Sequence, residues 1–527
     1  MIRTPMDEAA QPATVSSAWI VYVTALLEGA SVIVVEIAGA RALAPFFGTS
    51  LQVWTAQITV TLFFLAAGYG VGGLLAKSLR PTTLPMLFAI AGFMLALYPV
   101  MRGPILDASS ANLGVAFGSL ISASILFGPT LLALGAVSPV LIAYIDRRRP
   151  GAGSAAGRLF FTNTMGGLAG GWLTAFVLIP HMSLRIALVT TGVVLLLIAA
   201  VWLFAGRSNA SAVVVVPALL IAGYILFFSQ PERVFKEKHG MSFEMKYSHQ
   251  SGIGLLQVLE FADSRALLIN GVLQGQLDLS SDFHGARSEY IHSMDILARS
   301  HHPTARTALQ LGLGAGLLPK ELDHRGVKVK TIEIEPQIVK LARDYFELPQ
   351  SVEVITADAR SFLRHDTGKY DLIFLDTFAS ESTPWHILTV EAMAEIKARL
   401  NPGGRLIINT VSFPDPKKAA LDGIEASVLS AFPEEIVYAS PPETNDPEEL
   451  VNVLIVAGEN LHADPKVDPN PIHSAHLAKL LALARPGTRT ATPCTDDRSN
   501  LDYAQASMRV HWREAIWQTQ SSNLLSD

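Results

Sequence analysis

The order of hydrophobic and polar residues divides the chain into two parts. From Trp19 to Phe228 the sequence is almost entirely apolar and is interrupted only by short polar breaks, whereas the sequence after Pro231 is charged, mixed and rich in turn-forming residues. A helix that crosses a bilayer core needs about 20 predominantly apolar residues. The first part is therefore predicted to be an all-α, multi-pass membrane bundle of about seven helices, at residues 19–40, 53–76, 84–101, 113–144, 158–180, 186–205 and 211–228.

Small residues and prolines shape these expected helices. The stretch from Gly114 to Tyr144 is too long for one perpendicular span, so we expect tilt, or kinks at Pro129 and Pro139. Small residues let helices approach closely in lipid. Contacts between helices are accordingly expected at Gly68, Gly70, Gly72, Gly73, Gly166, Gly167, Gly170 and Gly171.

The first expected span carries two acids, Glu28 and Glu36, and ends at Arg41. Ionisable groups at membrane depth are costly and usually face a partner or a cavity. The two acids are eight residues apart, which places them about 80° apart around one helix. Two interpretations stay open: structural pairing with Arg41 or a neighbouring helix, and a polar pathway for a substrate or cation.

The loop charges bear on the membrane side of the second part. Cytoplasmic loops carry an excess of Lys and Arg, and these residues follow the second, fourth and sixth expected spans (Lys77, Arg80, Arg147, Arg148, Arg149, Arg158 and Arg207). Seven spans would then leave the second part outside the cell, whereas a nucleotide-type cofactor is expected in the cytosol. Three explanations stay open: the span count is off by one, one segment does not span, or the second part is extracytoplasmic. We favour the first, which places the second part on the cytoplasmic side of the cell (inner) membrane. Asp7 and Glu8 make residues 1–18 an N-terminal tail and not a secretory signal.

Strand and helix patterns alternate in the second part. A hairpin is predicted from the strand-like runs 254–261 and 265–269, and a helix follows at 288–299. Strands are expected at 308–311, 328–334, 352–355, 371–375 and 404–409, and helices at 317–324, 336–345 and 390–400. This alternation predicts a doubly wound α/β fold with a parallel sheet.

A glycine-rich loop, Gly312-Leu-Gly-Ala-Gly316, lies between the first of these strands and the next helix. Glycines at that place let the backbone approach a nucleoside at the positive end of a helix. Glu333 ends the next strand, about 20 residues after the loop, a spacing that suits a carboxylate binding ribose hydroxyls. The alternative is a packing turn with a solvated Glu333.

Two further acids follow strands. Asp358 comes after the third strand and Asp376 after the fourth, at the edge where such sheets bind ligands. A carboxylate there is poorly solvated and suited to accept a proton or a cation. A helix N-cap is the alternative for either residue.

Composition narrows the chemistry. A net charge of −6 without a basic block gives nucleic-acid binding no support. The single Cys494 excludes a disulfide framework and any multi-cysteine metal site, and we expect no metal.

These features together resemble the spermidine synthase (polyamine aminopropyltransferase) family in its membrane-fused form, whose Rossmann-like catalytic domain is similar to class I methyltransferases and follows a β-hairpin region. In the apolar part the resemblance lies in Val35-Glu-Ile-Ala-Gly-Ala-Arg41, Leu43-Ala-Pro-Phe-Phe-Gly48 and Gly157-Arg-Leu-Phe-Phe-Thr-Asn-Thr-Met-Gly166, and near the end of the chain in Thr495-Asp-Asp-Arg498. It implies a membrane domain at 19–230, a β-hairpin region at 241–287, a catalytic domain at 288–505, a C-terminal tail at 506–527, and homodimers like those of soluble synthases.

The resemblance also implies roles for individual residues. Asn270-Gly-Val-Leu-Gln274 resembles the family's Asp-Gly-Val-Ile-Gln, and Glu289-Tyr-Ile-His292 resembles a segment that supplies a tyrosine. Asp376 would be the base that frees an amine lone pair, and Tyr290 a second catalytic residue. S-adenosylmethionine or its decarboxylated form would be bound as co-substrate by Gln274, Gly312, Gly314, Gly316, Glu333, Asp358 and Ala359.

The chain departs from the family at two acids. Ala315 replaces the aspartate of the family's glycine loop, and Ala379 replaces the second aspartate after the fourth strand. Both the aminopropyl group and its acceptor are cations, and an unpaired buried ammonium is costly. Glu381, Asp496 and Asp497 are candidates to compensate.

Three functions follow as alternatives. The first is a membrane-bound transferase that moves an aminopropyl group to an amine and releases methylthioadenosine. The second is an enzyme that acts on intact S-adenosylmethionine, which Ala315 favours. The third is a transporter or membrane scaffold with a nucleoside-sensing domain, suggested by Glu28 and Glu36.

Overall fold

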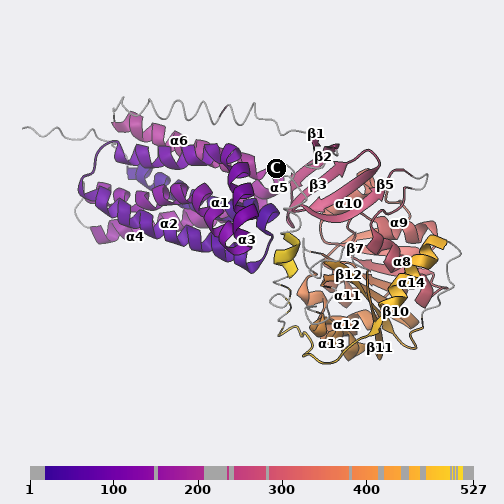
Figure 1. Ribbon diagram of the computed structural model, residues 1–527. Helices are drawn as coiled ribbons and strands as arrows, with labels where there is room; N and C mark the ends of the chain where they lie inside the picture. The colour runs from indigo at the N-terminus through magenta and orange to yellow at the C-terminus, as the bar shows by residue number, and fades with distance from the viewer. Residues whose placement is uncertain are drawn as a thin grey trace, which may run out of the picture. The chain divides into compact units, whose positions relative to one another are not determined.

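The computed structural model describes residues 18–147, 152–206, 223, 234–236, 242–280, 284–378, 383–413, 421–440, 450–462, 471–498, 501, 505 and 508–513. The chain forms two compact units, one of Met1–Glu232 with Leu525–Asp527 and the other of Arg233–Leu524 (Figure 1). We call them the helical unit and the α/β unit.

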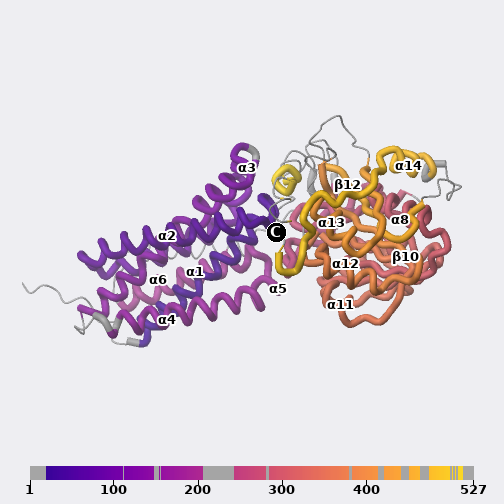
Figure 2. The backbone as a smooth tube through the Cα atoms, turned by 90° about the horizontal axis from the view of Figure 1, so that it is seen from below, coloured from indigo at the N-terminus to yellow at the C-terminus, as the bar shows by residue number. Residues whose placement is uncertain are grey.

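The helical unit consists of long apolar helices, and α1, α2, α4 and α6 run alongside one another in both views (Figures 1 and 2). The backbone of α3 leaves helical geometry at Gly114, whose φ is 65°, and not at Pro129 or Pro139. The elements are α1 (Ala18–Phe47), α2 (Leu51–Lys77), α3 (Thr83–Asp146), α4 (Ala152–Leu173), the π-helix η1 (Thr174–Leu178), α5 (Ile179–His181) and α6 (Leu184–Gly206).

Within the described residues, five helical segments are long and apolar enough to cross a membrane: Trp19–Phe47, Leu51–Lys77, Thr83–Ser110, Asn112–Asp146 and Leu184–Ala205. The expected count of about seven is therefore not reached there. The predicted span 158–180 is helical, in α4, η1 and α5, but is not among the five. The predicted span 211–228 lies outside the described residues apart from Gly223.

Small residues bring the helices into close contact, as the sequence predicts. A Cβ atom on Gly68 or Gly72 of α2 would lie 2.4 or 2.5 Å from a backbone oxygen of α3. Gly166 of α4 packs in the same way against the Leu26 carbonyl of α1. Gly70 and Gly73, by contrast, face open space, so only one side of α2 makes these contacts.

Glu28 is held by neighbouring helices. It is 3% exposed, and its carboxylate accepts hydrogen bonds from Ser138 of α3 and Asn163 of α4. These bonds join three helices, which favours the structural interpretation of this acid.

The α/β unit begins with an antiparallel sheet in the order β1-β2-β3-β4-β5. The expected hairpin is confirmed as β3 and β4, within a larger sheet than the sequence indicated. The strands are β1 (Val234–Lys236), β2 (Ser242–Gln250), β3 (Leu255–Glu260), β4 (Ser264–Ile269) and β5 (Val272–Asp278). Asn270 and Gly271 connect β4 to β5 with φ values of 50° and 78°, the backbone that an Asn-Gly hairpin turn requires.

The second sheet has eight strands in the order β13-β11-β12-β10-β9-β6-β7-β8. Among the described residues, the five strands predicted from the sequence, β6 to β10, pair in parallel, which confirms the predicted parallel sheet. The strands β12, β11 and β13, which were not predicted, extend it with antiparallel pairing. The strands are β6 (Thr307–Leu311), β7 (Lys328–Glu333), β8 (Glu353–Thr356), β9 (Tyr370–Leu375), β10 (Leu400–Ser412), β11 (Glu434–Ala439), β12 (Val451–Gly458) and β13 (Arg485–Pro486).

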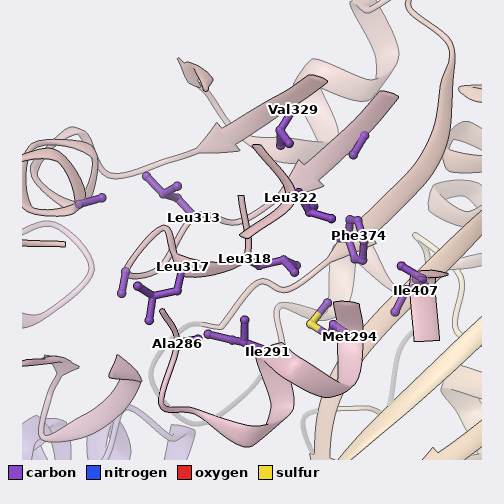
Figure 3. Packing of buried hydrophobic residues seen from close by; sticks show 14 of the residues in the cluster. Ala286, Ile291, Met294, Leu313, Leu317, Leu318, Leu322, Val329, Phe374 and Ile407 are labelled. Atoms are coloured by element: carbon purple, nitrogen blue, oxygen red, sulfur yellow. The ribbon is translucent and has the colours of Figure 1, made fainter. Parts of the chain in front are cut away.

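Helices cover both faces of this sheet. Alternate residues of each strand point to opposite faces, so that Phe374 joins one buried cluster and its neighbour Leu375 the other. Figure 3 shows Met294 among the labelled side chains of the first cluster, close to Phe374 and Ile407. That face carries α8 (Glu289–His301), α9 (Leu317–His324), α10 (Pro336–Tyr345) and α14 (Pro471–Ala482); the other carries α11 (Ala359–His365), α12 (Val390–Lys397) and α13 (Asp422–Ala431).

Arg360 of α11 is 5% exposed and forms hydrogen bonds to other segments of the α/β unit. Its guanidinium donates to Glu395 of α12, to Asp496 and to the backbone carbonyl of His386. Thr389 also donates to Asp496, at 2.7 Å. Asp496, a candidate to compensate for the missing acids, is thus an ion-pair partner of Arg360.

Replacing Arg360 by Met should lower the thermal unfolding midpoint of the α/β unit by roughly 10 °C. Removing one member of a buried ion pair costs about 3–5 kcal/mol, because the remaining charges stay buried. Arg364 binds the same two acids from an exposed position, with its side chain 53% exposed, so Arg364→Met should change the midpoint little. Calorimetry of the detergent-solubilised protein measures the unfolding midpoints of both variants. Equal midpoints would contradict the stabilising role of the buried Arg360 ion pairs.

Candidate active site

A cavity of about 210 Å³ lies at the carboxyl ends of β6, β7, β8 and β9. We call it the strand-end cavity. Parallel strands bring the loops that follow them to one edge of the sheet. Of the nine predicted site residues, eight line this cavity, namely Gln274, Tyr290, Gly312, Gly314, Glu333, Asp358, Ala359 and Asp376. Gly316 does not line it: it lies at the N-terminus of α9 with a φ of 76°.

The glycine loop is shaped by close backbone contacts. Gly312 has a φ of 92°, and a Cβ atom there would lie 2.1 Å from the carbonyl oxygen of Asp376. Its N–H donates to the carbonyl of Ile332 at 2.9 Å. Gly314, with a φ of 54°, has no atom nearer to its Cβ position than the Gln274 carbonyl, at 3.4 Å. The loop therefore fits tightly against the end of β9 and leaves space above Gly314.

Gly312→Ala should destabilise the α/β unit more than a left-handed backbone alone explains. Such a backbone costs a non-glycine residue about 1–3 kcal/mol, and the new Cβ atom would also overlap the Asp376 carbonyl. Gly326 provides the control, since its φ is 81° and nothing lies within 4 Å of its Cβ position. We expect the thermal midpoint of Gly312→Ala to lie below that of Gly326→Ala; coincident midpoints would show that the close contact has no energetic effect.

Glu333, 8% exposed, connects the end of β7 to the glycine loop. One carboxylate oxygen accepts from the N–H of Leu313 at 3.0 Å and the other from the N–H of Glu335 at 2.8 Å. Burial raises the pKa of Glu333, while these backbone hydrogen bonds oppose the shift. The backbone of Ile334 donates a third hydrogen bond, which leaves one of the four lone pairs of the carboxylate for a hydroxyl donor in the cavity.

Asp358 caps a helix and also lines the strand-end cavity. One oxygen caps α11 by accepting from the N–H of Ser361 at 2.8 Å. The other lies 3.6 Å from Nε2 of His386, across the cavity wall. Asp358, Ala359 and His386 all line the cavity, so the N-cap does not remove Asp358 from it.

Asp376 lies directly after β9 in a polar chain. Asn409 of β10 donates to its carboxylate at 2.9 Å, and Asn452 of β12 donates to the Asn409 side-chain oxygen at 3.0 Å. Burial raises the pKa of Asp376 to about 6, and the bond from Asn409 partly offsets this. A carboxylate with such a pKa accepts protons at neutral pH.

Tyr290 and Gln274 separate the strand-end cavity from a second one. The Tyr290 hydroxyl donates to the Gln274 carbonyl at 3.0 Å. Burial, with the negative charge of Asp376, raises the pKa of Tyr290 well above its usual value, so Tyr290 stays a neutral hydrogen-bonding group. Both residues, together with Phe378, line both cavities.

The second cavity has a volume of about 600 Å³, and we call it the wide cavity. Its lining includes both neutral polar and apolar side chains, and Arg287 and Glu289 contribute one charge of each sign. Its lining is Leu273, Gln274, Gln276, Arg287, Ser288, Glu289, Tyr290, Phe378, Asn409, Val411, Ser440, Leu450, Val451, Asn452 and Trp512.

The structure describes only some of the positions where the family's acids are replaced or could be compensated. Ala315 is 3% exposed and packs toward Gly275 of β5, away from both cavities. Asp497 lines neither cavity. Ala379 and Glu381 lie outside the described residues.

Several lining residues were not predicted from the sequence. Asn409 lies inside a strand, where no turn or glycine marks it, and Trp512 lies in the stretch assigned to the C-terminal tail. Thr377 borders the strand-end cavity with a buried hydroxyl that has no hydrogen-bond partner among the described residues. The described ranges contain no cluster of three or more His, Cys, Asp or Glu side chains suited to a metal ion.

Comparisons with known proteins agree with this arrangement. Residues 309–408 match the methyltransferase domain family. A polyamine aminopropyltransferase of Corynebacterium efficiens is 27% identical over 441 residues, 77% of this chain and 80% of that protein. A probable polyamine aminopropyl transferase of Bifidobacterium longum is 27% identical over 190 residues, 36% of this chain but only 42% of that protein.

Among solved structures, a probable spermidine synthase from Corynebacterium glutamicum aligns with 52% of this chain and 99% of its own, with 20% identity and a TM-score of 0.39. The relative from Corynebacterium efficiens matches across most of both sequences. The resemblance to the polyamine aminopropyltransferases that the motifs indicated is therefore confirmed.

Proposed function

We propose that this relative of the polyamine aminopropyltransferases is itself a membrane-bound transferase of the spermidine synthase type, which moves an aminopropyl group from decarboxylated S-adenosylmethionine to an amine. The observation that carries the proposal is the position of Asp376, which lines the strand-end cavity beside the Tyr290 and Gln274 wall of the wide cavity. A donor in the first cavity and an acceptor in the second would meet next to this carboxylate.

The strand-end cavity has suitable groups for the adenosyl part of the donor. The Glu333 carboxylate can accept a hydrogen bond from a ribose hydroxyl. The buried Thr377 hydroxyl has no hydrogen-bond partner among the described residues and could bond to the donor. Asp358 and Ala359 would face the adenine, and the open space above Gly314 would let the backbone approach the donor. Gln274, on the wall shared by both cavities, would lie near the reacting carbon.

The wide cavity would hold the acceptor amine. Asp376 takes a proton from the ammonium, the freed lone pair attacks the carbon next to the sulfonium, and a C–N bond forms. The C–S bond breaks, its electrons neutralise the sulfur, and methylthioadenosine leaves. Because the donor is already activated, the protein has mainly to position both partners and exclude water. Asn409 would hold the Asp376 carboxylate in place for this step.

The rate should depend on pH through Asp376. Its ionised form is the base, so kcat/KM should be nearly constant above the pKa of about 6 and should fall about tenfold per pH unit below it. Because the acceptor enters this step as an ammonium, its own pKa should affect the rate only at high pH, where the amine loses its proton in solution. Two acceptor amines of different pKa distinguish the two ionisations. The fall of kcat/KM near pH 6 should occur at the same pH with both acceptors. A fall whose midpoint shifts with the pKa of the acceptor would show that it comes from the substrate and not from Asp376.

Intact S-adenosylmethionine is the second candidate donor, in methyl transfer or another cleavage of the sulfonium. The match to the methyltransferase domain family supports it. Both candidates use the same strand-end cavity.

Product analysis distinguishes them. Purified full-length protein is incubated with linear diamines and, separately, with the intact and the decarboxylated donor, and nucleosides are identified by mass. The proposal predicts methylthioadenosine from the decarboxylated donor, in an amount matched by aminopropylated amine. S-adenosylhomocysteine from the intact donor would establish methyl transfer instead, and no nucleoside product from either donor would refute both.

The five apolar helices suggest association with a membrane. We propose that the helical unit anchors the enzyme in the cell membrane with the α/β unit on the cytoplasmic side, because the donor is a cytosolic metabolite.

A further inference from the structure

The C-terminal segment 508–513 forms part of the wide cavity. It is helical, and Met508 and Trp512, four residues apart, lie on one side of it. Met508 packs with Val411 and Phe413, and this small apolar cluster also includes Phe378 and Leu450. Trp512 lines the cavity, and its ring meets the edge of Phe378 at a centroid distance of 6.5 Å. Two aromatic rings thus form one apolar wall.

Arg513 ties this segment to the opposite wall. It is 1% exposed, and its guanidinium donates to the carbonyl of Asn270 at 2.6 Å. Asn270 holds the turn between β4 and β5, where its side chain also accepts from the N–H of Leu255 at 2.9 Å. The turn leads into Leu273 and Gln274, which line the cavity. A charged donor makes the stronger kind of hydrogen bond, so the bond from Arg513 links the segment that carries Trp512 to the turn that leads into Leu273 and Gln274.

The lining of the wide cavity holds polar groups as well as apolar ones. Asn409 and Asn452 are linked to each other and to Asp376, whereas Phe378, Leu450, Val411 and Trp512 are apolar or aromatic. An acceptor with its amine at Asp376 would lay its carbon chain against these apolar side chains. A carboxylate for the amine and apolar side chains for the carbon chain suit a linear aliphatic amine better than a branched or strongly hydrated one.

We infer that Trp512 is a specificity-determining residue of the acceptor cavity, and that Arg513 is the positioning residue that holds it there. The inference rests on the proposed function. Trp512 sets the width of the apolar wall and so limits the acceptor to an unbranched alkyl chain. The residue belongs to the last part of the described chain, beyond the strands and helices that form the donor cavity.

Three variants of the full-length protein test the role of Trp512, with acceptor KM and methylthioadenosine affinity as readouts. Trp512→Ala should raise the KM of a linear diamine about 10-fold or more and should admit branched amines that the wild type rejects, because a hydrophobic contact in a pocket typically changes discrimination by at least this factor. Trp512→Phe keeps an aromatic wall and should restore most of the preference. Met508→Ala removes packing from the same helix side but does not line the cavity, so its acceptor preference should match that of the wild type.

Arg513→Lys tests the positioning role. Lysine is shorter and has an ammonium group in place of the guanidinium, so it should bind the Asn270 carbonyl less well. The variant should have a higher KM for the acceptor, nearly the same kcat, and the same affinity for methylthioadenosine.

The outcomes separate the two proposals. A wild type that forms no methylthioadenosine with any amine would refute the proposed function and this inference with it. An active wild type whose Trp512→Ala variant keeps the same acceptor KM and preference would overturn the inference alone. The same would follow if Met508→Ala changed the preference as much as Trp512→Ala, since the effect would then come from loosening the helix.

Discussion

Asp376→Asn should reduce kcat by about 10²- to 10⁴-fold and leave the affinity for methylthioadenosine within about twofold of the wild type, because general bases typically contribute a factor of that size. Asparagine has nearly the same shape and can still accept the hydrogen bond from Asn409, but it cannot take a proton at neutral pH. The change therefore removes the proposed chemistry with little effect on the cavity. The fall in rate below the pKa of about 6 should disappear with it.

Asp366→Asn is the matched control, since Asp366 accepts from the hydroxyl of Tyr370, at the far end of β9, and lines neither cavity. It should keep wild-type kcat. Stopped-flow or steady-state assays of methylthioadenosine release give both numbers. An Asp376→Asn variant with more than half of the wild-type kcat would rule out Asp376 as the base.

Glu333→Gln should weaken the binding of methylthioadenosine about 10- to 100-fold. Hydrogen bonds to a charged group contribute about 1.5–3 kcal/mol each, and an uncharged amide makes weaker ones to the ribose. The amide also presents an NH₂ group where the carboxylate now accepts from the N–H of Leu313 or Glu335, which disturbs the glycine loop. Both effects act on binding before any bond is broken.

Glu335→Gln serves as the comparison, because Glu335 is as buried as Glu333 but caps α10 through the N–H of Gln337 and lines neither cavity. Its affinity should equal that of the wild type. Titration calorimetry measures both variants. Unchanged binding by Glu333→Gln would contradict a ribose contact, whereas weakened binding by both variants would indicate a general change in the loop.

The parallel half of the fold was predictable because its signals are local. Glu335 and Pro336 are a strong helix start, and α10 has the predicted bounds, as α9 does. The acids Glu333, Asp358 and Asp376 lie at or directly after strand ends, and this pattern alone predicts that they share one edge of a sheet. The structure then brings these three acids to one cavity, while their roles there stay proposals.

The antiparallel end of the sheet and several residues of the cavities depend on tertiary contacts, which the sequence alone did not reveal. The antiparallel strands β11, β12 and β13 were not predicted, and nothing in the alternation of strands and helices distinguishes their direction. Asn409 became part of the site only because β10 lies beside β9. Trp512 is distant in sequence from every other lining residue, and the packing of Met508 and Arg513 brings it to the cavity. Such long-range neighbours leave no periodic pattern in a single sequence.

The proposed transfer requires that the strand-end cavity binds an adenosyl sulfur compound. Titration calorimetry of the full-length protein in detergent with methylthioadenosine tests it most directly, with Asp366→Asn as a positive control and Glu333→Gln as the weakened site. We expect saturable binding with one molecule per chain in the wild type and in Asp366→Asn, and a Kd at least about 10-fold higher in Glu333→Gln. No binding to the wild type, or equal affinity in all three proteins, would contradict it.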